Sequence, residues 1–195
     1  MIKIFFCIYI FIILIFNYGC NAPGVLATAG GTTMVVAEGE RSVGTVIDDA
    51  TIKVQIVTQF ISSEDSLYLN IDTTVVEGRV LLTGIVGTQE IRIDAVRRVW
   101  GIQGVKEVIN EIEVGDKTTL KEYTQDLWIN TQVKGLAAKI IGLRALSYNF
   151  ETIKGKVYIA GITSHEEQLN KLIDSIQNIK GVKEIINYTI IKEIS

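Results

Sequence analysis

The sequence is poor in the residues that build metal centres and catalytic pairs. Its 195 residues include one histidine, two cysteines and one proline. These numbers argue against a zinc site or a cysteine–histidine pair. The sequence also lacks a block of basic residues, and its formal net charge is −3, so we expect no broad electrostatic binding to nucleic acid. Since we find no nucleophile–base pair or glycine-rich phosphate loop either, we predict neither an enzyme nor a cofactor.

The N-terminal apolar run is too short for a membrane-spanning helix. Lys3 precedes an apolar stretch at 4–16, whereas a span requires about 20 apolar residues. A small residue and then Cys20 follow shortly after this stretch. The pattern predicts a secretory signal peptide at 1–19, which takes no part in the fold.

Cys20 stands where this leader would be cleaved, as in bacterial lipoproteins, whose cysteine becomes the lipidated first residue. Because Cys7 lies within the apolar run, cleavage would leave Cys20 as an unpaired exported thiol, which lipidation explains. Asn17 replaces the usual leucine-like residue, so an unmodified signal anchor with an incidental cysteine is the alternative. By analogy, Asn21 favours the outer membrane, because many lipoproteins kept in the inner membrane carry aspartate there.

Beyond the leader, the chain repeats itself. Residues 20–45 are rich in Gly, Ala and Thr without clear periodicity, and we predict a flexible tether. Further on, "GVKEVINEI" begins at 104 and "GVKEIINYT" begins at 181, an offset of 77 residues. The same offset aligns the two halves of the chain without a gap, pairing for example Asp49 with Asp126 and Gly78 with Gly155. Such a repeat indicates a duplicated structural unit.

Each copy is predicted to be a helix, two strands, a second helix and a third strand. In the first copy a helix starts near 46–48, with acidic residues at its start and apolar residues every four positions. A tight turn at Gly78 joins strands at 68–76 and 79–86. A helix at 88–100 and a strand at 104–114 complete the copy. The result is an α+β fold with helices packed on a three-stranded sheet, in domains at 46–115 and 122–195.

In the second copy we expect a helix at 123–142 and a last strand at 181–191. Before its second helix, "SHEE" at 164–167 has the pattern of a capping box, with Ser164 as the cap and Glu167 reaching back. His165 lies in the first turn of that helix, and we expect it to be solvated or to cap the helix.

Several motifs carry a resemblance to a known family. They are "RSVGTVIDD" at 41–49, "EGRVLLTG" at 77–84 with its twin "IKGKVYIAG" at 153–161, and the two "GVKE" strands. The paired units resemble the BON domain, which occurs in bacterial exported lipoproteins and periplasmic osmotic-stress proteins. The likeness covers about 41–195. It implies two tandem BON domains in a lipid-anchored envelope protein that binds anionic phospholipid through the second domain and supports outer-membrane integrity, with other envelope proteins as possible partners. The alternative is a periplasmic chaperone or osmotic-stress protein that acts on polypeptides.

The clearest difference between the copies is Trp128, which aligns with Thr51. On the predicted helix Trp128 lies on the flank of the apolar stripe, near Gly135 and Lys139. A tryptophan beside lysines suits a membrane interface, since the indole is mostly apolar and the ammonium groups attract anionic head groups. The resemblance implies lipid contact in this helix, so we predict a lipid-binding site at Trp128, Lys134, Gly135 and Lys139. The alternative is that Trp128 packs against the first copy.

Overall fold

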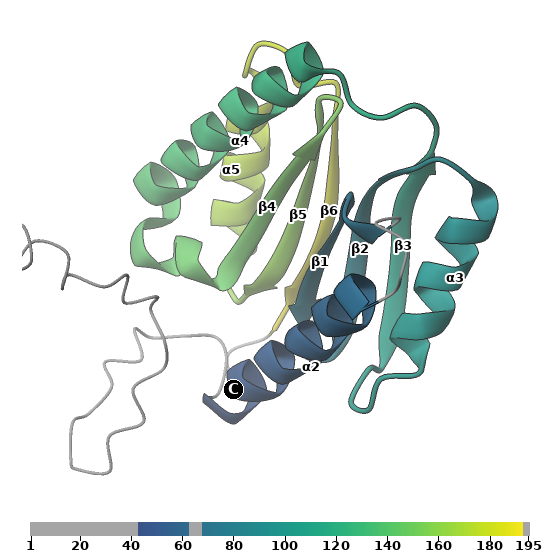
Figure 1. The fold of residues 1–195 in the computed structure, drawn as a ribbon. Coiled ribbons are helices and arrows are strands. Elements are labelled where there is room, and N and C mark those ends of the chain that lie inside the picture. Colours follow the sequence, from purple (N-terminus) through teal and green to yellow (C-terminus); the bar gives the residue numbers. More distant parts are fainter. Residues whose placement is uncertain (1–42, 63–67, 193–195) are drawn as a thin grey trace, which may run out of the picture. The chain divides into compact units, whose positions relative to one another are not determined.

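The computed structural model of the chain describes residues 43–62 and 68–192. The predicted signal peptide, Cys20 and nearly all of the predicted tether lie outside the described residues. The described residues belong to one compact unit. They form the helix–strand–strand–helix–strand order twice, as the sequence predicted (Figure 1).

The first copy consists of α2 (Val43–Ser62), β1 (Ile71–Val76), β2 (Arg79–Val86), α3 (Gln89–Trp100) and β3 (Glu107–Val114). Strand β2 is central: it pairs antiparallel with β1 and parallel with β3. Nearly every residue of β2 is buried, as expected for a strand with both faces covered.

The second copy repeats this topology. It consists of α4 (Leu120–Ile141), β4 (Tyr148–Ile153), β5 (Lys156–Thr163), α5 (Glu166–Gln177) and β6 (Glu184–Ile191), with a 3₁₀ segment η2 (Gly142–Ser147) between α4 and β4. Strand β5 is central, antiparallel to β4 and parallel to β6. The α+β fold predicted from the repeat is therefore confirmed.

Several boundaries differ from the predicted ones, among them the start of β1 at Ile71 rather than 68 and the start of α4 at Leu120 rather than 123. Helix α2 begins at Val43, so 43–45, placed in the tether from the sequence, are helical. No acidic residue lies in its first turn, and the predicted acidic helix start is wrong. The third strands begin at Glu107 and Glu184 rather than at 104 and 181, because Gly104 and Gly181 adopt φ values of 94° and 99° that first turn the chain.

The capping box predicted at 164–167 is wrong. His165 occupies the N-cap position of helix α5, and its side chain makes no capping hydrogen bond. The His165 N–H donates instead to Thr163 Oγ1 at 3.0 Å. A capping box does occur at the start of α4, where Glu122 N–H donates to Thr119 Oγ1 at 3.3 Å and Thr119 N–H donates to Glu122 Oε2 at 2.9 Å.

A buried aspartate fastens the first helix of each copy to its hairpin. In the first copy Glu77 and Gly78 both have positive φ, 55° and 79°, which is typical of a type I′ turn. Their N–H groups donate to the two carboxylate oxygens of Asp49, each at 2.8 Å. The second copy repeats the arrangement with Asp126, Lys154 and Gly155. The alignment of these aspartates in the sequence therefore reflects a requirement of the fold.

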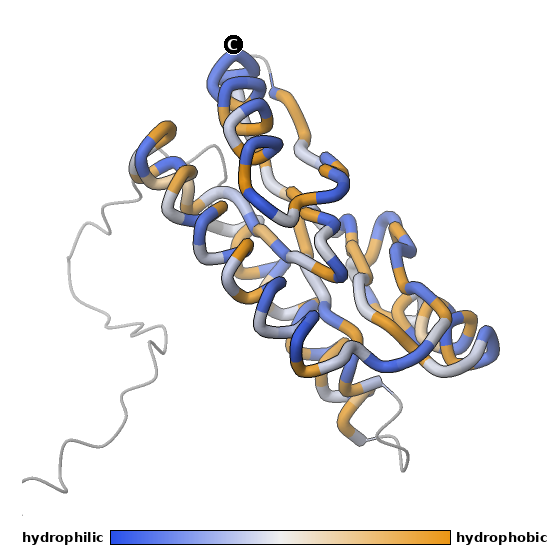
Figure 2. Tube along the Cα trace, turned by 90° about the horizontal axis from the view of Figure 1, so that it is seen from above, coloured by the Kyte–Doolittle hydropathy of each residue, from blue (hydrophilic) through white to orange (hydrophobic). Residues whose placement is uncertain are grey.

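The helices of each copy cover one face of their sheet (Figure 1). One core lies between α2, α3 and the first sheet, and another between α4, α5 and the second. Hydrophobic and hydrophilic residues alternate along the helices (Figure 2), so each helix can bury one side.

A third core joins the two sheets through their faces opposite the helices. From the first sheet this core takes Val76, Leu81 and Ile85. From the second sheet it takes the residues that lie 77 positions later in the sequence. Those second-sheet members are Ile153, Tyr158 and Ile162. The same positions of both copies thus meet, as across a two-fold axis.

A polar contact supports this approximate symmetry. The Tyr188 hydroxyl donates to Glu111 Oε1 at 2.5 Å, and the two residues are separated by the repeat offset of 77. Equivalent positions touch each other only close to the axis that relates them. Lys156 adds an ion pair with Glu113 at 2.7 Å. The duplicated domains therefore resemble the two halves of an isologous dimer joined in one chain.

Candidate functional site

Helix α4 carries large apolar side chains on its solvent side. They lie in its first half: Leu120, Tyr123, Leu127 and Trp128, of which Leu120 is 79% exposed and Trp128 is 48% exposed. The buried face of the helix is separate and consists of Ile129, Val133, Ala137 and Ile141. A cluster of exposed apolar side chains of this kind marks an interaction surface. We call these four exposed residues the α4 patch.

Helix α4 also carries three lysines. Lys121, Lys134 and Lys139 are all exposed on this helix. The helix has two acidic residues against these three lysines. The Glu122 carboxylate accepts hydrogen bonds in the capping box, which lowers its pKa, and the Asp126 carboxylate is buried against the hairpin turn. The accessible charge of α4 is therefore mainly positive.

The predicted lipid-binding residues all lie on exposed positions of α4. Trp128, Gly135 and Lys139 share one strip of the helix, and Lys134 lies beside Leu127 on the neighbouring strip. The helix runs through Gly135 without interruption, and a Cβ atom there would meet nothing within 4 Å. Packing therefore does not require glycine at this position.

Trp128 belongs to none of the three hydrophobic cores formed by the described residues. The contact between the copies runs through the sheets, and α4 covers the opposite face of its own sheet. This arrangement gives no support to the alternative in which Trp128 packs against the first copy. Two neighbours in the same motif do serve the fold, since Asp126 and Ile129 are buried.

A cleft lies next to the α4 patch. Its volume is about 630 Å³, and it is bounded by the start of β1, the linker before α4, the first half of α4 and the end of β4. Leu120, Tyr123 and Leu127 line it from α4, and Leu69 lines it from the first copy. Leu120 lies before the helix predicted at 123–142, whereas Tyr123 and Leu127 lie inside it and were not predicted as site residues. Their spacing of three and four residues, offset from the core stripe, was the available signal.

The cleft also contains a partly buried carboxyl group, that of Glu151. Burial, together with the nearby Asp72 carboxylate, raises the pKa of Glu151 to about 7, while Lys134 acts in the opposite direction. The equivalent residue in the first copy is Thr74. This acid is therefore a feature of the second copy and not of the shared fold.

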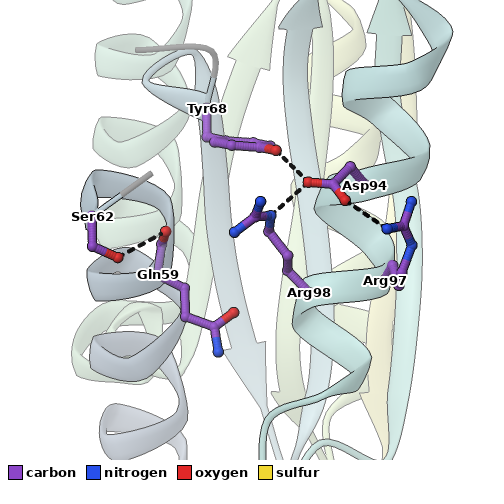
Figure 3. A network of polar contacts seen from close by, with 6 residues as sticks. All are labelled: Gln59, Ser62, Tyr68, Asp94, Arg97 and Arg98. Atoms are coloured by element: carbon purple, nitrogen blue, oxygen red, sulfur yellow. Dashed lines mark hydrogen bonds and ion pairs between the residues drawn. The ribbon is translucent and has the colours of Figure 1, made fainter. Parts of the chain in front are cut away.

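A second polar cluster lies in the first copy, around Asp94 (Figure 3). Its Oδ2 atom accepts hydrogen bonds from the Tyr68 hydroxyl and from Arg98 Nε, the latter at 2.5 Å, while Arg97 pairs with Oδ1 at 3.0 Å. The Tyr68 ring stacks on Phe60 with centroids 5.1 Å apart. These hydrogen bonds lower the pKa of Asp94. Because both carboxylate oxygens are occupied, we interpret the cluster as a structural tie between Tyr68 and α3.

Other kinds of site find no support in residues 43–62 and 68–192. No group of three or more His, Cys, Asp or Glu side chains in this part of the chain is arranged to hold a metal ion. None of its helices has both the length and the hydropathy to cross a bilayer. The α4 patch with its lysines is therefore the strongest candidate site in the described structure.

Comparison with known proteins finds matches along both copies. The family described as the BON domain matches residues 48–116 and 125–193. The "Uncharacterized protein in gshII 5'region" of Anaplasma centrale is 38% identical, over 75% of this chain and 96% of its own length. The "Outer membrane lipoprotein DolP" of Haemophilus influenzae is 30% identical over 88% of each chain. The "Osmotically-inducible protein Y" of Escherichia coli is 25% identical, over 75% of this chain and 74% of its own.

Proposed function

Since the chain belongs to the BON domain family and carries two BON domains, we propose that it is a bacterial cell-envelope protein that binds anionic phospholipid through α4 and supports outer-membrane integrity. It is held at the outer membrane, facing the periplasm, by lipid on Cys20. The outer-membrane lipoprotein and the osmotically inducible protein among its relatives support an envelope role. The role is binding rather than catalysis.

The observation that carries the proposal is the composition of the exposed face of α4. The α4 patch combines two aliphatic side chains with Tyr123 and Trp128, and the same helix carries three exposed lysines. Tyrosine and tryptophan favour the boundary between head groups and acyl chains, because each has an apolar ring and a polar tip. Each lysine adds about 1 kcal/mol near an anionic surface.

The equivalent face of α2 differs in both respects. It carries no aromatic residue, Thr51 stands at the position of Trp128, and Lys53 is the one basic residue of the helix. The two copies share a fold but present different outer surfaces. This difference supports the second domain as the lipid-binding one in our proposal.

Vesicle binding tests this proposal. All three cores are built from the described residues, so a chain beginning at residue 21 keeps the folded part. We expect it to bind vesicles that contain phosphatidylglycerol and to ignore purely zwitterionic ones. Trp128→Glu should abolish binding with little change in melting temperature, since the side chain is half exposed. Added salt should weaken wild-type binding, because it screens the lysines.

Thr51→Glu is the matched control, because Thr51 is exposed at the equivalent position of the first copy, and it should bind lipid like wild type. Two results would contradict the proposal: wild-type protein that ignores anionic vesicles, or a Trp128→Glu variant that melts much earlier. If the protein instead suppressed aggregation of unfolded polypeptides without any lipid preference, the chaperone alternative would be favoured.

A further inference from the structure

The solvent side of α2 carries a continuous apolar seam. Its members follow each other at spacings of three and four residues along nearly the whole helix: Ile47, Ala50, Val54, Val57 and Ile61. All five are exposed, Val54 by 64% and Ile61 by 66%. The opposite side of α2 packs into the first core through Ile52, Ile56 and Phe60. The helix is thus apolar on two faces, only one of which the described structure covers.

The fold does not require the seam. In α4, the equivalent helix of the second copy, the same five positions hold Thr124, Leu127, Thr131, Lys134 and Ala138. Three of them are polar or charged, although both helices pack on their sheets in the same way. The first copy therefore has an apolar face that its twin lacks, and such a face indicates an interaction surface.

We propose that the α2 seam pairs with the α2 seam of a second copy of this chain, the two helices lying parallel. A spacing of alternately three and four residues is that of positions a and d in a two-helix contact. In this register the a positions are Ile47, Val54 and Ile61, and the d positions are Ala50 and Val57. β-Branched residues at a are typical of two-stranded parallel pairs, although such pairs usually carry leucine at d, where this seam has Ala50 and Val57.

The flanks of the seam suit pairing with itself. They consist of Val46 and Lys53 on one side and Thr51 and Thr58 on the other. A parallel pair sets Lys53 opposite Thr58 of the other copy, so no like charges meet. The Thr51 hydroxyl donates to the Ile47 carbonyl at 2.9 Å, so it is already satisfied within its own helix.

A membrane surface fits the seam less well. Interfacial helices place Lys or Arg beside the apolar face, with aromatic anchors within it. The α2 seam has no aromatic residue, and the exposed charges of the helix are Asp48 and Lys53, which cancel. These features favour another helix, rather than an anionic lipid surface, as the binding partner of the α2 seam.

The pairing would be weak and preorganised. From Ile47 to Ile61 the seam is about 21 Å long at 1.5 Å per residue, short for a stable interface on its own. The helix is already held by its sheet, so no folding entropy is lost on pairing. The parallel arrangement also places the N-terminal ends of both α2 helices at the same end, as expected for two chains attached to one surface through Cys20.

Disulfide crosslinking tests both the partner and the orientation. The chain from residue 21 contains no cysteine, because the two cysteines are Cys7 and Cys20. In a parallel pair, purified Ile47→Cys and Ile61→Cys should each crosslink to themselves under mild oxidation. The matched control is Thr124→Cys, the exposed α4 equivalent of the Ile47 variant, and it should crosslink far less. Crosslinks that form only when the two variants are mixed would overturn the parallel arrangement, and no crosslinks above the control would overturn the pairing.

A charge in the seam provides an independent test. Val54→Glu should raise the dissociation constant of the dimer by about a hundredfold or more, because two carboxylates would have to lose water at its centre. Sedimentation equilibrium measures this constant, and an unchanged melting temperature shows that the variant is folded. Thr131→Glu, the α4 equivalent, should dimerise like wild type. Dimerisation that survives Val54→Glu would overturn the proposal. Because α2 and α4 variants are separate, this outcome is distinguishable from a failure of lipid binding.

Discussion

Two buried aspartates, Asp49 and Asp126, each hold a hairpin turn against the first helix of their domain. Each accepts two backbone N–H groups at 2.7–2.8 Å. Hydrogen bonds to a charged acceptor are stronger than neutral ones, and a buried donor that loses its partner pays the cost of desolvation. These residues therefore couple helix to sheet in both copies.

We expect Asp126→Ala to lower the free energy of unfolding by about 3 kcal/mol, because the turn loses two hydrogen bonds to a charged acceptor. Urea unfolding measures this change. Asp49→Ala should cost a similar amount in the first copy. Asp48→Ala is the control, since Asp48 is exposed one residue away, and it should be nearly neutral. An Asp126→Ala protein as stable as wild type would show that the turn does not depend on the carboxylate.

Glu151 should give the protein a pH-dependent stability. Burial raises its pKa to about 7 from an ordinary value of 4.5, so the folded state holds the proton over a range where the unfolded state has lost it. Stability should therefore fall as pH rises from about 4.5 to about 7 and then level off. Glu151→Gln should remove this decline, so that the variant is more stable than wild type at pH 8 and similar at pH 4.

Thermal unfolding across this pH range gives the comparison, and carbon NMR of the Glu151 carboxyl gives its pKa directly. Asp72→Asn serves as a companion variant. Because the Asp72 carboxylate helps to raise the pKa of Glu151, its removal should bring that pKa down. A wild-type Glu151 that titrates near 4.5 would contradict the argument.

At the scale of elements, the repeat made most of the fold predictable. Identical phrases at a fixed offset predicted two copies, and the alternation of β-branched residues predicted both hairpins and the third strands. The positions of helix caps were harder to predict from the sequence. The capping box was placed before α5 but occurs before α4, because a cap depends on backbone conformation as well as on residue type.

The candidate site was predictable only in part. Trp128 stood out because its twin position holds threonine, and its exposure follows from its distance to the core stripe. The cleft was not predictable, since it needs Leu69 of the first copy to lie near α4 of the second. The α2 seam was not predicted for another reason. From sequence alone, an apolar residue on an exposed helix face cannot be distinguished from a core residue.

The divergence of the copies shows which positions are free to change. Both first helices keep the aspartate and the core stripe that the fold requires, while their outer faces differ. The outer face of α2 is apolar without aromatic residues, and the outer face of α4 carries lysines and exposed aromatic residues. A duplicated domain thus presents two distinct surfaces on one scaffold.

At the scale of the whole molecule, the core between the sheets decides whether the two domains act as one. Each copy spans about 70 residues, a size at which a lone core is marginal. The shared core buries apolar residues from both sheets, among them Ile85 and Ile162 at equivalent positions. Lys192 and Glu77 add an ion pair between the copies. We therefore expect wild-type protein to unfold in a single cooperative transition.

Ile162→Asp should separate this transition into two. Ile162 is fully buried between the sheets, and a carboxylate there would have to lose its water without a partner. Each helix–sheet core would remain, so the domains should unfold independently and at lower temperature, as calorimetry would show. Ile85→Asp, at the equivalent position of the first copy, should have the same effect. Val80→Ala, in the core beneath α2, is the control, because it should lower the melting temperature of a single transition. If Ile162→Asp also melted in one step, the domains would be coupled by something other than the core between their sheets.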